Sequence, residues 1–417
     1  MKYFINAKIY PEFHHIEVSG KLVDLPKQDQ ITFYLNKNFV IQKFGIIDDM
    51  WKYFFDLDGE APQYVAIARP VHIILEEDTV EFQYYGTVND FIDDVNIIVP
   101  DLVELAIYSA WFPFIPGVLF DYSLEIELPN EYTVISNGVI TSEKQNDQCT
   151  IYHVSSIMPT LDIVICASPK LIKKSIASEN LLAQIVYPRD FPQLSEGKLE
   201  AISEAYNQLG RILGPAKQLG YLTIVFSPRY GWGYARTPMF IRSGQYAAQQ
   251  TNSEQDHHVD FHEMAHFWWD IADPQTTNDW INEGGAEYSA FILSKWFHGD
   301  KFINRLLYDY ISHSEESITN TPIILTESTS PDRYVNRYQK VTLMYLGAEK
   351  QFGIDKFRFF LKAFYTKYKD NKSATTENFL EMAEDYLGAE ASRYFQNILN
   401  LKSWKSINIR KDILKLE

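Results

Sequence analysis

A cluster of histidines in the second half of the chain has the residue types and spacing of a metal site. Four of the ten histidines lie between residues 257 and 266, where His262-Glu263-Met264-Ala265-His266 forms an HExxH pattern. On a helix, positions i and i+4 share a face, so both imidazoles can reach one zinc ion about 2.0–2.1 Å away. The pattern therefore predicts His262 and His266 as zinc ligands. Glu263 is the expected general base, which takes a proton from a water molecule and delivers it to the leaving group.

A catalytic zinc site needs a third protein ligand and one open position. The best candidate is Glu283, which begins a second expected helix in the segment Trp280-Ile281-Asn282-Glu283-Gly284. This glutamate would complete a His2Glu site for one zinc ion. Although HExxH also occurs by chance in long proteins, the apolar residues beside it and this second segment favour a metal site.

The first part of the chain has the pattern of β structure. Short runs of alternating or β-branched residues predict strands at 31–35, 80–84, 132–136 and 161–166, and the third is followed by the tight-turn signal Asn137-Gly138. No helical period is present before about residue 195. Consecutive strands without intervening helices favour antiparallel pairing. We therefore expect an N-terminal antiparallel β domain, a sandwich or saddle, over residues 1–170.

The second part becomes mixed and then helical. Apolar residues at three- and four-residue steps predict a helix over 199–213 that ends at Gly214-Pro215, and a strand over 222–226 follows. Later helices are expected at 355–368 and after Thr376, the expected N-cap. The chain is therefore expected to be an α+β multidomain protein with a mixed and helical catalytic domain over residues 171–417.

The composition restricts the partners. The formal net charge is −17, with 38 Lys+Arg against 55 Asp+Glu, which argues against nucleic acid and an anionic membrane as partners. The uncharged stretch 105–120 contains Pro113 and Pro116 and is expected to be a buried aromatic loop or strand, not a membrane span. Two cysteines and an N-terminus without a signal-peptide pattern predict a cytoplasmic protein. The oligomeric state is not indicated.

These motifs resemble those of the gluzincin zinc aminopeptidases of the aminopeptidase N and leukotriene hydrolase type. That family pairs HExxH with a Glu ligand in a Trp-Leu-Asn-Glu-Gly-like segment, which Trp280 to Gly284 matches. Its downstream Tyr-x-Lys-Gly is matched by Tyr338-Gln339-Lys340, with Val341 in place of the glycine. The resemblance implies a thermolysin-like catalytic domain in which His262, His266 and Glu283 bind zinc, Glu263 is the base, and Tyr338 donates to the oxyanion.

Several neighbouring residues have alternative interpretations. Tyr334 is the rival to Tyr338 as oxyanion donor. Asp270 is either a solvated loop carboxylate or a hydrogen-bond partner of a ligand histidine. His257 and His258 are expected to be solvated, and so is the charge of Lys340. Trp268 and Trp269 are expected to pack in the core.

The resemblance does not extend to the segment that precedes the helix of His262 and His266. There the family has Gly-x-Met-Glu-Asn, whose glutamate binds the free α-amine of the substrate. The matching stretch, residues 230–237, contains no carboxylate. The resemblance implies substrate binding by residues of this stretch: Gly231, Trp232, Gly233, Tyr234 and Arg236. Arg236 either points into the cleft, where it would repel an ammonium group, or into solvent. Larger relatives add a C-terminal helical domain, so a more open site is expected here.

Together these features predict a zinc-dependent metallopeptidase that hydrolyses peptide substrates, an aminopeptidase with atypical recognition of the substrate N-terminus. One alternative is a zinc-bearing but catalytically inactive module that binds a peptide or protein. Another is hydrolysis of a non-peptide substrate such as an ester or epoxide, which the same zinc chemistry allows.

Overall fold

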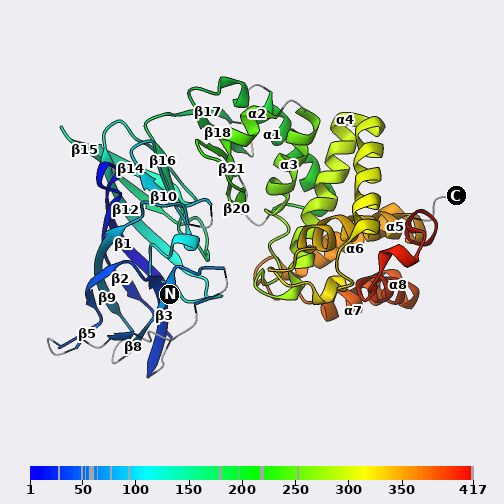
Figure 1. Ribbon diagram of the computed structural model, residues 1–417, viewed down its shortest axis with the longest axis horizontal. Helices are drawn as coiled ribbons and strands as arrows, with labels where there is room; N and C mark the ends of the chain where they lie inside the picture. The colour runs from blue at the N-terminus through cyan, green and yellow to red at the C-terminus, as the bar shows by residue number, and fades with distance from the viewer. Residues whose placement is uncertain are drawn as a thin grey trace. The chain divides into compact units, whose positions relative to one another are not determined.

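The computed structural model describes residues 1–414 apart from 27–28, 48–49, 52, 56–60, 63, 76–77, 93, 178–180, 196, 217–219 and 251–252. Within this part the chain packs as two compact units, drawn in Figure 1. The β unit comprises Met1–Ser175, Gln184–Glu196 and Leu222–Gln249, and the helical unit comprises Ile176–Ala183, Gly197–Tyr221 and Gln250–Glu417. The predicted α+β organisation is confirmed, and the boundary at residue 170 stays a prediction.

One sheet of the β unit is built on the strand that begins the chain. Its order is β14-β15-β12-β1-β2-β9-β4. The strands are β1 (Lys2–Tyr10), β2 (His15–Val23), β4 (Val40–Phe44), β9 (Val80–Thr87), β12 (Asp121–Pro129), β14 (Val139–Gln145) and β15 (Cys149–Ser155). Along β1, buried and exposed residues alternate, as a strand with one solvated face requires. The expected antiparallel pairing holds for β1–β2 and β12–β15, whereas β1 and β12 pair in parallel.

Smaller sheets also belong to the β unit. One has the order β10-β11-β16-β13, with β10 (Ile97–Val99), β11 (Leu102–Leu105), β16 (Ile165–Ser168) and β13 (Thr133–Ser136). Another joins β3 (Gln30–Asn36), β8 (Ala68–Ile74) and β7 (Tyr53–Phe55), and β5 (Ile46–Ile47) pairs with β6 (Met50–Trp51). The stretch 105–120 is the expected buried aromatic segment, since Trp111, Phe112, Phe114 and Phe120 lie in the core.

The Asn137-Gly138 turn connects a strand of one sheet to a strand of another. β13 before it pairs with β16, and β14 after it pairs with β15. The buried Asn137 side chain accepts from Tyr122 Oη and donates to the Asp162 carbonyl, both at 2.9 Å. A Cβ at Gly138 would lie 2.6 Å from Tyr122 Oη, so the close approach requires glycine.

A mixed sheet carries the stretch predicted to bind substrate. Its order is β17-β18-β19-β21-β20, with β17 (Leu171–Ala177), β18 (Leu182–Pro188), β19 (Tyr221–Ser227), β21 (Met239–Ser243) and β20 (Tyr234–Arg236). β19 contains the predicted strand at 222–226 and pairs in parallel with β21. β20 pairs antiparallel with β21 and lies at the edge of the sheet, and α2 (Gly244–Gln249) follows β21.

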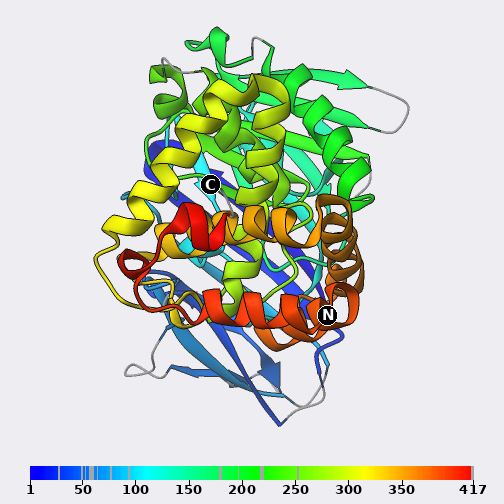
Figure 2. The same cartoon turned by 90° about the vertical axis from the view of Figure 1, so that its right-hand side faces the viewer.

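The helical unit consists mainly of helices (Figure 2). Their buried residues form an aromatic and aliphatic core. The helices are α1 (Lys198–Leu213), α3 (Ser253–Ala265), α4 (Trp280–Glu316), α5 (Val341–Phe352), α6 (Ile354–Tyr368), α7 (Thr376–Leu387) and α8 (Ala389–Leu399). α1 ends before Gly214 and α6 covers 355–368, as predicted. α4 contains a break at Gly299, whose φ of 74° and ψ of −174° are not helical. Glycine adopts such a conformation without steric cost, so the helix divides there into two limbs.

The N-cap predicted for α7 is off by one residue. Thr375, not Thr376, caps the helix, because its Oγ1 accepts from the Asn378 backbone N–H at 3.2 Å. The Thr375 backbone N–H in turn donates to Asn378 Oδ1 at 3.3 Å. The Thr376 hydroxyl instead donates to Asn278 Oδ1 and accepts from Trp280 Nε1, both at 2.9 Å. Adjacent threonines look alike in sequence, and the contact with α4 decides between them.

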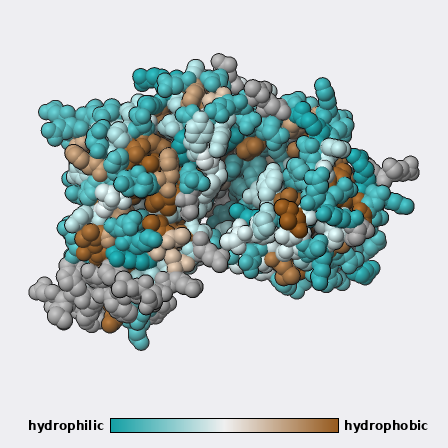
Figure 3. All heavy atoms as spheres, in the orientation of Figure 1, coloured by the Kyte–Doolittle hydropathy of each residue, from teal (hydrophilic) through white to brown (hydrophobic). Residues whose placement is uncertain are grey.

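Exposed apolar residues are scattered over the surface. On the face in Figure 3, hydrophilic residues cover most of the described part and apolar residues form separate patches. Among the helices that the structure describes, none combines the length and apolar composition needed to cross a bilayer.

Candidate metal centre

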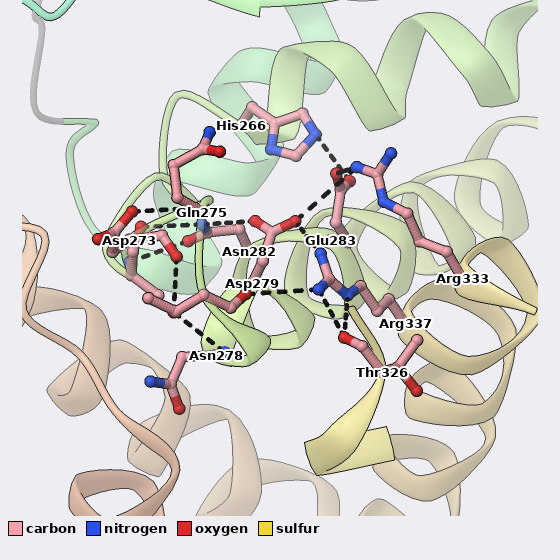
Figure 4. Close-up of polar contacts among 12 residues, drawn as sticks. His266, Asp273, Gln275, Asn278, Asp279, Asn282, Glu283, Thr326, Arg333 and Arg337 are labelled. Atoms are coloured by element: carbon pink, nitrogen blue, oxygen red, sulfur yellow. Dashed lines mark hydrogen bonds and ion pairs between the residues drawn. The ribbon is translucent and has the colours of Figure 1, made fainter. Parts of the chain in front are cut away.

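The two segments that carry the predicted ligands are tied together by Asn282. His262 lies on α3, His266 directly follows its last residue, and Glu283 lies in the first turn of α4. Asn282 Oδ1 accepts from the backbone N–H groups of Ile271 and Ala272, both at 3.0 Å, and its Nδ2 donates to the Ala272 carbonyl. The loop after His266 is therefore held against the start of α4, which fixes Glu283 relative to His266 (Figure 4).

The structure brings the three predicted ligands together. His262 Nε2 and His266 Nε2 are 3.2 Å apart, and Glu283 Oε2 lies 3.5 and 3.3 Å from them. A tetrahedral zinc ion with bonds of about 2.0–2.1 Å separates its ligand atoms by about 3.3–3.4 Å. Among the described residues, the buried Glu283 Oε2 has no hydrogen-bond partner. The three atoms therefore fit one ion of this size and geometry.

Each ligand histidine is also held in its orientation by a contact through Nδ1. His262 Nδ1 is 2.6 Å from Glu287 Oε2, and His266 Nδ1 is 3.1 Å from the Trp269 carbonyl. With Nδ1 as the donor, the lone pair of Nε2 faces the other ligands. Sequence reasoning missed this role of Glu287, although its position four residues after Glu283 puts both carboxylates on one helical face.

Asp270 is not the partner of a ligand histidine. Its Oδ2 is 2.6 Å from Lys372 Nζ, and its side chain is 42% exposed. The interpretation of Asp270 as a loop carboxylate at the surface is therefore the right one, with the addition of an ion pair.

The site attracts positive charge. Burial alone would lower the pKa of His262, but the neighbouring carboxylates of Glu283 and Glu287 raise that pKa to about 10. Burial alone would raise the pKa of Glu283, but the two neighbouring imidazoles hold that pKa well below its usual value. Two buried carboxylates around two imidazoles therefore favour a bound cation, whether protons or a divalent metal ion.

One arginine contacts the ligand carboxylate from the other side, and a second arginine binds the nearby Asp279 (Figure 4). Arg333 Nη2 is 3.2 Å from Glu283 Oε1, the oxygen not turned toward the histidines. Arg337 is buried, and its Nη1 is 2.7 Å from Asp279 Oδ2 while its Nη2 donates to the Thr326 carbonyl at 2.6 Å. Sequence reasoning missed these residues, because only the fold brings residues 333 and 337 to the start of α4.

Tyr338 lies directly against a ligand histidine. It belongs to a π-helical turn, Val335–Lys340, and its ring stacks on that of His262 with centroids 5.1 Å apart and planes 10° apart. Tyr334 is 54% exposed and packs on Tyr338 with ring centroids 4.8 Å apart. Burial, and then the charge of Glu283, raise the pKa of Tyr338 well above its usual value, so its phenol is a neutral donor. Of the two tyrosines, Tyr338 is therefore the one in contact with the metal centre.

Glu263 follows His262 on α3 and is partly exposed. It is close enough to His266 for its charge to contribute to the raised pKa of that histidine, after the effects of burial and of Glu283. A partly exposed carboxylate near a ligand histidine can be reached by water, and its role as a base stays a prediction.

Two expectations about nearby polar residues are wrong. His258 is 3% exposed and bonded to Glu287 and Ser294, because it lies four residues before His262 on the same buried face of α3. Lys340 is 1% exposed, and its Nζ donates to Asn336 Oδ1 at 2.7 Å and to Ser317 Oγ at 3.1 Å. Trp268 and Trp269 are buried as expected, and each indole N–H has an acceptor.

The residues predicted to bind substrate lie in the β unit. Gly231 has a φ of +96°, and a Cβ there would lie 2.3 Å from the Asp94 carbonyl oxygen. It leads through the partly exposed Trp232 and Gly233 to the buried Tyr234. Glycine is therefore required at 231 for the turn that presents Trp232 at the surface.

Arg236 is held in an ion pair. Its Nε is 2.7 Å from Asp162 Oδ2, its Nη2 donates to Tyr108 Oη at 2.8 Å, and Asp162 is fully buried. The guanidinium also lies over the rings of Tyr108 and Tyr234. A neighbouring carboxylate, Glu104, is likewise bound by an arginine, since its Oε1 is 2.6 Å from Arg229 Nη2. The charge of Arg236 is therefore balanced within the β unit.

Comparisons with known proteins point in one direction. No protein-family model matches the chain. The chain is 22% identical over 312 residues to Leucine aminopeptidase 2 of Coccidioides immitis, a match that covers 68% of this chain and 48% of that protein. It is also 22% identical over 273 residues to Leucine aminopeptidase 2 of Ajellomyces capsulatus, with 60% and 42% covered. The chain thus spans about half the length of the curated relatives it matches.

Solved structures share the fold over almost the whole chain. An M1 zinc metallopeptidase of Deinococcus radiodurans bound to a Tyr-Ser-Ala substrate has a TM-score of 0.75 and 14% identity, covering 97% of this chain and 94% of that one. Legionella pneumophila aminopeptidase A, in complex with aspartic acid, has a TM-score of 0.76 and 13% identity, covering 96% and 49%. The chain has the fold of the M1 zinc metallopeptidases, the gluzincin aminopeptidases that its motifs resemble.

Proposed function

We propose that this protein is a zinc-dependent metallopeptidase that holds one zinc ion with His262, His266 and Glu283. The observation that carries the proposal is the triangle of ligand atoms, 3.2 to 3.5 Å on a side. The fold shared with M1 zinc metallopeptidases and the similarity to proteins named leucine aminopeptidases support it.

The chain's own residues supply the proton transfers and the oxyanion contact. Zinc, when bound, would polarise a peptide carbonyl and lower the pKa of a water molecule. Glu263 takes a proton from the attacking water and later delivers it to the leaving amine. The Tyr338 phenol stays protonated and donates a hydrogen bond to the carbonyl oxygen as negative charge develops on it. Glu287 and the Trp269 carbonyl keep the ligand imidazoles in the tautomer that binds metal.

Recognition of the substrate N-terminus is proposed to be atypical. Residues 230–237 contain no carboxylate that could pair with a free α-amine, and Arg236 is bound to Asp162. The adjacent Glu104 is bound to Arg229. A carboxylate already paired with a guanidinium offers an ammonium group little additional attraction. An amine must therefore be bound by other acidic groups or by none, and we expect only a weak preference for free over acetylated N-termini.

The test is hydrolysis of a peptide library presented with free and with acetylated N-termini. We expect turnover that is abolished by chelation, restored by zinc and lost in Glu263→Gln. Glu254→Gln is the matched control, since Glu254 lies on the same helix with a side chain 40% exposed. Zinc binding without turnover of any peptide would instead identify an inactive binding module. A strong preference for free amines would contradict the atypical recognition but not the peptidase activity.

A further inference from the structure

The break in α4 brings together two residues that a straight helix would keep far apart. Glu287 and Tyr310 are 23 positions apart on α4, and the Tyr310 hydroxyl donates a hydrogen bond to Glu287 Oε1. At 1.5 Å per residue, an unbroken helix would separate them by about 34 Å. The non-helical Gly299 lies between them and lets the second limb of α4 return toward the first (Figure 2). The fold thus places the Tyr310 hydroxyl beside Glu287, the carboxylate that contacts His262.

A histidine of α3 reaches the same carboxylate oxygen. His258 Nε2 is 3.1 Å from Glu287 Oε1 and 3.2 Å from Tyr310 Oη, and its Nδ1 is 2.9 Å from Ser294 Oγ. All of these residues are 3% exposed or less. One arrangement of protons satisfies each contact to Glu287: Ser294 donates to His258 Nδ1, and His258 Nε2–H, Tyr310 O–H and His262 Nδ1–H all donate to the carboxylate.

We propose that Tyr310 and His258 are positioning residues of the metal centre. They hold one oxygen of Glu287, which leaves the other oxygen aimed at His262 Nδ1 and thereby aims His262 Nε2 at the metal. This inference rests on the proposed zinc site. Without these two donors, Oε1 would be buried and unpaired, and the carboxylate would turn to regain a partner. His262 would then lose the orientation on which its affinity for metal depends.

The test is the dissociation constant of Zn²⁺, measured by competition with a chromophoric chelator on the full chain. Tyr310→Phe removes one oxygen and keeps the ring, and we expect zinc to bind about 10–100-fold more weakly. Tyr308→Phe is the matched control on the same limb, because Tyr308 is 62% exposed. We expect it to bind zinc like the wild type.

A second pair of variants tests the contacts to Glu287 independently. His258→Gln keeps an N–H donor for Glu287, and His258→Leu removes it. We expect the glutamine variant to bind zinc more tightly than the leucine variant, and the visible spectrum of bound Co²⁺ to change in the leucine variant. If a substitution at one of the two residues prevents folding, the variants at the other residue still test whether these contacts affect zinc affinity.

The outcomes are distinguishable. A network that only stabilises the fold would lower the unfolding temperature of Tyr310→Phe and His258→Leu while leaving zinc affinity unchanged, and this result would overturn the inference alone. Failure of the wild type to bind zinc would overturn the proposed function together with it.

Discussion

Glu283 and Glu287 lie one turn apart on α4 and contact opposite edges of the same imidazole, that of His262. Glu283 Oε2 is 3.5 Å from Nε2, and Glu287 Oε2 is 2.6 Å from Nδ1. The orientation of this ring is therefore fixed by α4 as well as by α3, on which the residue lies.

Replacing Glu287 by glutamine should weaken metal binding. The amide keeps the size of the side chain but has one acceptor oxygen for the donors of His262, His258 and Tyr310. We expect about 10–100-fold weaker zinc binding, measured by chelator competition. Glu316→Gln, at the exposed end of the same helix, should bind zinc like the wild type. Equal affinities of the two variants would show that Glu287 does not support the ligand.

Removing the Tyr338 hydroxyl should affect turnover and not metal binding. A donor to the developing oxyanion contributes about 10²–10³-fold to kcat. We expect Tyr338→Phe to lose about this factor in peptide hydrolysis while its zinc content stays complete. Tyr334 packs on the ring of Tyr338, and Tyr334→Phe should retain near wild-type kcat. If Tyr334→Phe were the slower variant, the assignment of the two tyrosines would have to be exchanged.

Breaking the Arg236–Asp162 pair should destabilise the β unit. Arg236→Gln leaves the fully buried Asp162 with one fewer charged partner, and burial already raises the pKa of that carboxyl. We expect a loss of about 1–3 kcal/mol in the free energy of unfolding by urea. In contrast, Arg305→Gln breaks an exposed pair with Glu254 and should cost less than about 1 kcal/mol. A neutral effect of Arg236→Gln would mean that Asp162 finds other donors.

Lys340 should make stability depend on pH in the alkaline range. Burial lowers the pKa of Lys340 from 10.5 to about 8, against the opposing effect of Asp332. Between these values the folded state binds fewer protons than the unfolded state, so stability rises with pH from about 8 to about 10.5. Relative to Lys340→Met, the wild type should gain up to about 3 kcal/mol across this window, measured by urea unfolding at each pH. A constant difference between the two proteins would show that Lys340 stays charged when folded.

The local part of the metal centre was predictable from sequence. The i, i+4 spacing of His262 and His266 and the start of a helix at Glu283 depend on local periodicity, and the fold places these ligands together. The same spacing also connects Glu283 with Glu287 and His258 with His262, so the signal for both supporting residues was present and was not used.

The remaining contacts depend on tertiary structure. Tyr310 reaches Glu287 only because Gly299 breaks α4, and a lone glycine in a helical pattern does not reveal the angle of the break. Arg236 and Asp162 are 74 residues apart, and the parallel pairing of β1 with β12 joins residues 119 positions apart, such as Lys2 and Asp121. Local patterns contain no information about such distant partners.

The break at Gly299 has a consequence for dynamics. Because the second limb of α4 returns to the carboxylate behind His262, local opening of that limb and release of the metal ion become linked equilibria. Bound zinc should then slow amide hydrogen exchange along residues 300–316, far from the ligands in sequence, and detachment of that limb should shorten the residence time of the ion. The helix would thus couple the folding of a segment without ligands to the occupancy of the metal centre.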